Sequence, residues 1–342
     1  MVGSAWATDY DWYQWRAFAR TLEPDHVTLM REGAGSAVSA PSHNLLIQRF
    51  RNDHPELHHA FVKTIRIRNM AVRTEKTYEE WLVRFFQYHR WEQIEHLGLD
   101  QMAAFLEHLA VHRKVSSATQ KVALNSLVFF YREVLGRNVE GIYAYTRAKT
   151  RRRIPTVLSR DEVKALLGAI SGRAALMASL MYGTGMRVME CVRLRVQDID
   201  FEYLQITVRS GKGDKDRVVP LPQSLVAEIK TTLEKTRQLH RQDLDQGHGE
   251  ALLPAALARK LGKASYSFQW QFVFPATRLA VDYSTGVIRR HHVHQTSLQK
   301  AIRDAARKAG ILKRVTSYTL RHSFMKYIPV FPPAGQPTAV QI

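Results

Sequence analysis

Three positively charged side chains, far apart in the sequence, lie in short motifs that suit chemistry on a phosphate. Arg187 follows a Gly-Thr-Gly-Met turn, Lys212 lies in the tight turn Gly-Lys-Gly-Asp, and Arg321 lies in Thr-Leu-Arg-His-Ser. A guanidinium stays protonated and donates two parallel hydrogen bonds to the oxygens of a phosphodiester. An ammonium protonates a leaving 5′ oxygen, and a nucleophile must attack phosphorus. A lone arginine is usually a surface charge. The motifs therefore indicate metal-free phosphodiester transfer only if the three of them meet in space.

Two helices and a hairpin are predicted to position these cations. Residues 174–182 form a helical run of small and apolar side chains that the glycines end, and a new helix follows at once. Arg187 therefore falls at a helix start, where backbone N–H groups add a positive field. Residues 204–209 and 217–221 read as two strands around a turn, which makes a hairpin with Lys212 at its tip.

The order of these motifs resembles the tyrosine recombinases. The segments that carry the resemblance are Tyr-Gly-Thr-Gly-Met-Arg-Val-Met-Glu at 182–190, Gly-Lys-Gly-Asp-Lys-Asp-Arg at 211–217 and Tyr-Thr-Leu-Arg-His-Ser at 318–323. More narrowly, the chain is similar to the integron integrases. That similarity lies in Arg-Leu-Arg-Val-Gln-Asp-Ile-Asp-Phe at 193–201, Phe-Pro at 274–275, Arg-Arg-His-His at 289–292, and the segments 105–111 and 123–135. The resemblance covers residues 57–324.

The resemblance implies a role for each matching residue. Arg187 matches the first catalytic arginine, Glu190 the acidic residue that supports the site, Lys212 the lysine that protonates the leaving oxygen, and Arg321 the second arginine. Members of the family join DNA strands through a 3′-phosphotyrosine intermediate, without a metal ion or a nucleotide cofactor. Four subunits assemble on two DNA sites, so the implied partners are DNA and further copies of the chain in a homotetramer.

Two departures from the family pattern bear on catalysis. Tyr318 stands where a histidine is usual, and a phenol donates a hydrogen bond but carries protons poorly at neutral pH. The family's nucleophilic tyrosine lies on a later segment, whereas 21 residues follow Arg321 here. The resemblance stops at Phe324, residues 325–342 form an unrelated tail, and Tyr327 is too near Arg321 to match the nucleophile. We therefore expect a truncated recombinase that lacks its nucleophile and does not cleave DNA.

The composition favours a polyanionic partner. The 342 residues include 50 Lys and Arg against 31 Asp and Glu, a formal net charge of +19, and the pI is near 10.1. Nucleic acid is the favoured partner, with an anionic membrane surface or a merely soluble basic protein as alternatives. The sequence contains no apolar stretch of about 18 residues, so no membrane span is predicted. The N-terminus does not resemble a secretory signal. The single cysteine, Cys191, excludes an intramolecular disulfide and fits a buried, inert thiol in a reducing, cytoplasmic setting.

The predicted fold is mainly α-helical with a small β-sheet, divided between two domains. Residues 57–146 show apolar spacings of three and four, which predict a bundle of about four helices that acts as a DNA-binding, or core-binding, domain. Residues 147–156 read as a basic linker that meets phosphates or, alternatively, as a solvated loop. Residues 157–324 form an α+β catalytic domain, and residues 1–56 form an extension without an assigned function.

Capping signals mark several predicted helix starts. Asp100 precedes one amphipathic run of the bundle and Ser116 or Ser117 another, while Ser159 and Glu162 form a capping box at the start of the catalytic domain. Besides the catalytic candidates, the basic residues expected to contact DNA are Lys121, Arg151, Arg152, Arg153, Lys215 and Arg217.

A segment from about residue 247 to residue 294 matches an insert that the integron integrases carry. The resemblance implies that this insert grips bases extruded from a folded single strand, by stacking on their faces. The candidate side chains are Trp270, Tyr283, His291 and His292. The alternative is that Trp270 and Phe272 simply belong to the core. Zinc binding by His291, His292 and His294 is disfavoured because no cysteine or spaced carboxylate accompanies them.

Three functions remain in competition. The chain is a catalytically active, site-specific recombinase, an inactive remnant that still binds DNA, or a generic basic helical protein that binds RNA or a protein partner. The third does not explain two arginines and a hairpin lysine in the family's order. The missing nucleophile favours the second over the first.

Overall fold

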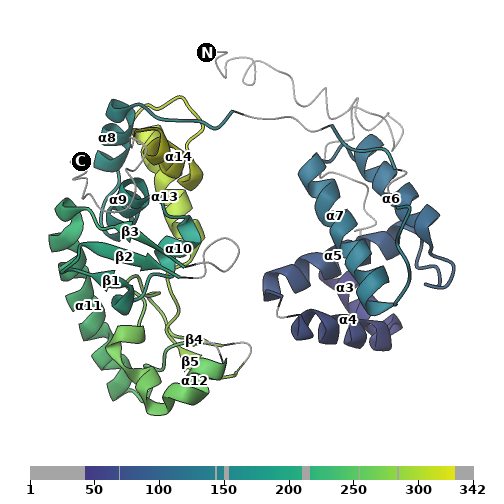
Figure 1. The fold of residues 1–342 in the computed structure, drawn as a ribbon, viewed down its shortest axis with the longest axis horizontal. Coiled ribbons are helices and arrows are strands. Elements are labelled where there is room, and N and C mark those ends of the chain that lie inside the picture. Colours follow the sequence, from purple (N-terminus) through teal and green to yellow (C-terminus); the bar gives the residue numbers. More distant parts are fainter. Residues whose placement is uncertain are drawn as a thin grey trace, which may run out of the picture. The chain divides into compact units, whose positions relative to one another are not determined.

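The computed structural model describes residues 43–327, apart from residues 69, 143–144, 150–153, 210–215, 254 and 283–284. The chain divides into two compact units, the first ending at Arg152 and the second beginning at Arg153 (Figure 1). The described parts are mostly helical with small sheets, which confirms the predicted fold class. Six residues singled out in the sequence lie outside the described residues: Arg151, Arg152, Arg153, Lys212, Lys215 and Tyr283.

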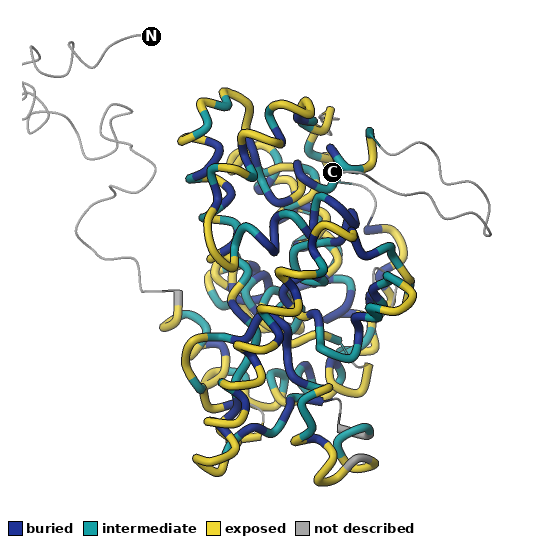
Figure 2. Tube along the Cα trace, turned by 90° about the vertical axis from the view of Figure 1, so that its left-hand side faces the viewer, coloured by how far each residue is buried: buried dark blue, intermediate teal, exposed yellow. Residues whose placement is uncertain are grey.

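The first unit is a helical bundle with an aromatic core. Its helices are α3 (His43–Asp53), α4 (Pro55–Ile67), α5 (Val72–Tyr88), α6 (Leu99–Val111) and α7 (Ser117–Phe129), which a π-helical segment, η1 (Phe130–Val134), continues. Rings from α4, α5, α7 and η1 fill the interior. In Figure 2, buried stretches of the chain are dark blue and exposed stretches are yellow. The hydroxyl of Tyr131 donates to the carbonyl oxygen of Leu97 at 2.7 Å, so the core satisfies the polar atom of its largest buried ring.

Helix α3 extends this unit beyond the predicted start at residue 57. It packs against α4 and α5, and its Phe50 is completely buried. Arg51 donates from Nε and Nη2 to the carboxylate of Glu79 on α5, at 2.7 and 2.9 Å. The Glu79 carboxylate is 5% exposed and the Arg51 side chain 48% exposed, and this bidentate ion pair ties α3 to the bundle.

The second unit surrounds a central helix. Its helices are α8 (Arg160–Gly168), α9 (Arg173–Thr184), α10 (Val188–Val192), α11 (Val226–Asp245), α12 (Ala255–Leu261), α13 (Gln295–Lys308) and α14 (Ser317–Tyr327). Helix α9 contacts α8, α10, α11, α13 and α14. Small side chains such as Ala178, which is fully buried, let these neighbours approach closely.

Two small sheets complete the second unit. Strands β1 (Ile199–Asp200), β2 (Gln205–Val208) and β3 (Arg217–Pro220) form an antiparallel sheet in the order β1-β2-β3. Strands β2 and β3 pair with Val208 opposite Arg217, which confirms the predicted hairpin. Strands β4 (Ala280–Val281) and β5 (Ile288–Arg289) form a second pair. Cys191 on α10 is fully buried as expected, and burial raises the pKa of its thiol.

The helix caps agree with the sequence at two of three starts. The Ser116 hydroxyl accepts from the backbone N–H of Thr119, and Ser159 and Glu162 form the expected capping box. The prediction of Asp100 as an N-cap is wrong. The Gln101 side chain accepts from the backbone N–H of Gly98 at 2.9 Å, so α6 starts one residue before Asp100. Within the described residues, no helix is both long and apolar enough to span a bilayer.

Candidate functional site

A sharp turn between α9 and α10 fixes the position of Arg187. Helix α9 ends at Thr184, and Gly185 follows with φ of +65°, a left-handed conformation that glycine adopts without strain. The Thr184 hydroxyl donates to the carbonyl oxygen of Leu180 at 2.6 Å and accepts from the backbone N–H of Met186. Arg187 is then the N-cap of α10, so its backbone is held by both helices.

The same glycine brings α14, which carries Arg321, against this turn. A Cβ atom at Gly185 would lie 2.5 Å from Cδ1 of Phe324, so only glycine leaves room for this ring. Ser323, one residue earlier on α14, accepts a hydrogen bond from the backbone N–H of Leu158 at 2.9 Å. Residues that are more than 130 positions apart in the chain are therefore packed together at one corner of the unit.

Glu190 lies between two arginines. Its Oε1 accepts from Nη1 of Arg187 at 2.8 Å and from Nη1 of Arg217 at 3.0 Å. Its Oε2 accepts from the backbone N–H of Arg187 at 2.8 Å and from Nη2 of Arg217 at 2.5 Å. Burial opposes ionisation of this carboxyl, which is 8% exposed, but the hydrogen bonds from Arg217 and Arg187 outweigh it and lower its pKa to about 2. Glu190 is therefore a permanent negative charge at neutral pH.

Arg321 shares the electrostatic environment of this cluster. Burial lowers the pKa of its guanidinium, and the positive charge of Arg187 lowers it further, while Glu190 partly offsets both effects. Its Nη1 is buried and has no hydrogen-bond partner among the described residues. A buried donor without a partner is costly, and an anionic oxygen is the group that would satisfy it best. Arg187 is close enough to Arg321 to act on its charge, while the joint binding of a phosphodiester by the two arginines stays a prediction.

The tyrosines of α14 differ in their surroundings. Tyr318, one turn before Arg321, is 60% exposed, and its ring centre lies 4.4 Å from that of His322. Tyr318 is therefore largely open to solvent. Tyr327 packs instead against α8, where the guanidinium of Arg160 lies 5.5 Å from its ring centre.

A basic groove of about 790 Å³ lies between α13 and the segment that leads into α14. Its cations are Lys300, Arg303, Arg307, Lys313 and Arg314. Among the described residues that line it, the one carboxylate, Asp304, pairs with Arg307, and Lys313 pairs with Glu162 at 2.6 Å, so the remaining cations are left to attract anions. This surface was not predicted from the sequence, although the spacing of Lys300, Arg303 and Arg307 indicates one face of a helix.

A second cavity, of about 820 Å³, is lined by the insert and by residues next to Glu190. Trp270, His291 and His292 contribute its rings, and Arg193 and Arg209 contribute charge. Trp270 is partly exposed, and its buried Nε1 has no partner among the described residues, whereas Phe272 is only 6% exposed. Both rings line the cavity, but Phe272 is buried as a core residue while Trp270 is partly exposed.

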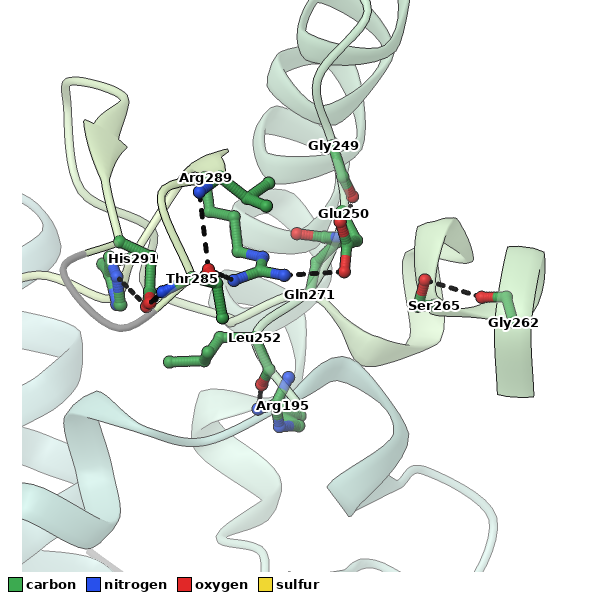
Figure 3. Close-up of polar contacts among 12 residues, drawn as sticks. Arg195, Gly249, Glu250, Leu252, Gly262, Ser265, Gln271, Thr285, Arg289 and His291 are labelled. Atoms are coloured by element: carbon green, nitrogen blue, oxygen red, sulfur yellow. Dashed lines mark hydrogen bonds and ion pairs between the residues drawn. The ribbon is translucent and has the colours of Figure 1, made fainter. Parts of the chain in front are cut away.

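Arg195 fastens the insert to the rest of the unit, and Arg289 links two segments within the insert (Figure 3). Arg195 donates to the carbonyl oxygens of Leu252, at 2.6 Å, and of Trp270, and its guanidinium lies 4.6 Å from the Phe272 ring centre. Arg289, 8% exposed, donates to the carboxylate of Glu250 and to the Thr285 hydroxyl at 2.7 Å. These contacts fix the backbone on which the rings of the cavity are mounted.

The remaining predicted residues are placed as follows. Lys121 is exposed on α7, and Arg217 directs both Nη atoms at Glu190. Contact of either with DNA stays a prediction. Burial lowers the pKa of His292, so its ring is neutral at pH 7. No cluster of three or more His, Cys, Asp or Glu side chains suited to a metal occurs in the part of the chain that the structure describes.

Comparison with known proteins identifies the family. The family described as "Phage integrase family" matches residues 156–327, and "Phage integrase, N-terminal SAM-like domain" matches residues 57–140. The first match runs slightly beyond Phe324, where the resemblance seen in the sequence stops. The chain therefore belongs to the phage integrase family of tyrosine recombinases.

Named relatives agree with this assignment. An "Integrase/recombinase" of Escherichia coli is 41% identical over 260 residues, 76% of this chain and 77% of the relative. "Tyrosine recombinase XerA" of Pyrococcus furiosus is 46% identical over 85 residues, 24% of this chain and 30% of the relative. Among solved structures, a lambda integrase dimer bound to a COC′ core site has a TM-score of 0.50 at 18% identity, over 84% of this chain and 74% of that chain. This last likeness concerns the fold alone.

Substitution of Gly185 by alanine should displace α14. We expect Gly185→Ala to lower the free energy of unfolding by about 3 kcal/mol, because it combines a left-handed backbone with a clash against Phe324. Gly136 is the matched control, because it has the same φ of +65° and no described atom lies within 4 Å of where its Cβ would be. Gly136→Ala should therefore cost only about 1 kcal/mol. Urea unfolding measures both, and equal losses would contradict the contact.

The ionised state of Glu190 should give stability that depends on pH. The pKa in the folded state is about 2 against an ordinary 4.5, so its contribution is complete above pH 4.5 and disappears as the pH falls towards 2. We expect Glu190→Gln to be less stable than the wild type by on the order of 2 kcal/mol at pH 7. The difference should narrow between pH 4.5 and pH 3 in urea titrations. A gap that stays constant over this range would show that Glu190 is not held ionised.

Proposed function

We propose that this chain is a DNA-binding recombinase subunit of the integron integrase type, which holds one backbone phosphate between Arg187 and Arg321. The observation that carries the proposal is the buried Nη1 of Arg321, which has no partner among the described residues and shares its surroundings with a second guanidinium. Glu190 neutralises one of the three nearby arginines, so the cluster keeps an excess of positive charge for a phosphodiester.

The basic groove beside α13 extends this proposed interface. Lys313 and Arg314 lie in the segment that leads directly into the helix of Tyr318 and Arg321, and Lys300 and Arg303 on α13 line the same groove. A duplex bound at the arginine pair is therefore proposed to meet the groove as well. We assign backbone contacts to Lys300 and Arg303 on this ground. Lys212 matches the lysine that protonates the leaving oxygen in members of the family that cleave DNA, and without cleavage we propose that it contacts the phosphate alone. The further basic contacts proposed from the sequence are Lys121, Arg151, Arg152, Arg153 and Lys215.

The cavity beside Glu190 supports the narrower, integron-type assignment. An extrahelical base presents a π face, and Trp270, His291 and His292 offer rings together with cationic neighbours. We propose that this cavity receives bases extruded from a folded single-stranded recombination site. The homotetramer on two DNA sites is proposed from the resemblance alone.

Binding without strand cleavage is the catalytic behaviour we propose. Tyr327, at the end of the described part of α14, has its ring centre 5.5 Å from the guanidinium of Arg160 on α8, so it is engaged away from the arginine pair. Tyr318 is suited to donate a hydrogen bond to the phosphate, since it replaces a histidine on the helix of Arg321. A duplex with a nick opposite the cleavage position traps covalent protein, and such a product would disprove the inactive state in favour of an active recombinase.

Duplex binding should depend steeply on salt and on the α13 groove. A selection from random duplex DNA identifies the preferred sequence. Titrations between 50 and 200 mM salt then give the slope of log affinity against log salt concentration, and over this range phosphate-binding proteins lose roughly 10³-fold or more in affinity. We expect Arg303→Gln to weaken binding and reduce the slope by about one, because one phosphate contact is lost. Arg237→Gln removes the same charge from the exposed face of α11 and should change neither. A flat salt response, or equal affinity for duplex RNA, would favour a generic basic protein.

The cavity should be needed for folded single strands and not for duplexes. We expect Trp270→Ala to weaken binding to a DNA hairpin with two extrahelical bases by about tenfold, since stacking of one base on a ring contributes roughly 1–3 kcal/mol. Affinity for the selected duplex should stay within about twofold in the same variant, which serves as the internal control for folding. Equal losses on both DNAs would remove the support for an extruded base.

A further inference from the structure

Arg217 makes an unusual contact for a residue that the sequence places among the DNA contacts. It is the first residue of β3, and its two Nη atoms bond the two carboxylate oxygens of Glu190 at 3.0 and 2.5 Å. The carboxylate is 8% exposed and the Arg217 side chain 33% exposed. These hydrogen bonds raise the pKa of Arg217, as expected for a guanidinium engaged by a negative charge.

We propose that Arg217 is a positioning residue, which acts on the phosphate through Glu190 and Arg187 rather than by touching DNA. This inference rests on the proposed role of Arg187 in phosphate binding. A carboxylate has about four acceptor sites, and here Arg187 takes two and Arg217 the other two. With both oxygens occupied from the β3 side, the carboxyl plane cannot rotate, and Arg187 meets a fixed partner.

The contact also joins two elements that are 27 residues apart. Glu190 lies on α10, while Arg217 is the first residue of β3 and pairs with Val208 of β2 across the hairpin. The arginine therefore sets the spacing between the sheet and the helix start that carries Arg187. Without it, Glu190 would keep a single partner, its pKa would rise, and the guanidinium of Arg187 would lose its restraint.

Single-phosphate replacement tests this role without strand cleavage. In the selected duplex, each phosphate is replaced in turn by an uncharged methylphosphonate, and affinity is measured for the full-length chain. We expect the wild type to lose about tenfold at the phosphate held by the arginine pair, the size of a charge-assisted hydrogen bond. Arg217→Met should reduce that loss to about twofold, and Arg217→Lys, which keeps the charge but not the fork, should fall between them.

A second background separates positioning from direct contact. In Glu190→Gln, the addition of Arg217→Met should have no further effect, because both changes interrupt one pathway. Arg237→Met, on α11, is the charge-matched control and should leave the tenfold loss unchanged. If Arg217→Met abolishes the loss at a different phosphate and leaves the first intact, Arg217 contacts DNA directly and the positioning role is overturned.

A measurement on the protein alone keeps the two proposals distinguishable. Phenylglyoxal modifies accessible guanidinium groups, and mass spectrometry follows the peptide that contains Arg187. We expect faster modification of Arg187 in Arg217→Met than in the wild type, and an unchanged rate would overturn the positioning role. If no methylphosphonate replacement lowers the affinity of the wild type for any DNA, the proposed phosphate site fails. The rate of Arg187 modification by phenylglyoxal still decides the role of Arg217.

Discussion

A carboxylate that is almost fully buried stays charged only when donors surround it, and the organisation of the second unit follows from that condition at Glu190. The donors come from the start of α10 and from the first residue of β3, so the position of the helix relative to the sheet is fixed. The remaining guanidinium arrives on α14, which reaches the turn because Gly185 leaves space for Phe324. An ordinary packing contact and a charged network therefore depend on each other, although neither is visible in a single motif.

The second unit carries two surfaces of different chemistry. The groove of α13 is lined by cations without aromatic rings, which suits a continuous backbone of phosphates. The cavity of the insert, which Glu190 also lines, combines rings with cations, which suits unpaired bases. Arg195, which follows α10, holds the insert through its Leu252 carbonyl, and Arg289 braces the insert internally through Glu250.

Much of the site was predictable because its motifs are local. Arg187, Glu190 and Arg321 lie in short patterns with turn glycines and helix starts, and the hairpin follows from alternation and a glycine-rich turn. The pairing of Arg217 with Glu190 was not predictable, because it depends on how a strand meets a helix 27 residues away. Helix α3 was not predicted for a similar reason, since its place in the bundle depends on Phe50 and on the distant Glu79. The cap at Asp100 failed because a neighbouring glutamine captures the N–H of Gly98.

The buried state of Cys191 has a practical consequence for work on this chain. It is the sole thiol in the sequence, it is fully enclosed by the core, and its raised pKa keeps it protonated. Maleimide reagents require an accessible thiolate, so the folded chain presents none. A cysteine introduced on an exposed face, such as α11, would then take up a fluorophore alone, without prior removal of the native residue.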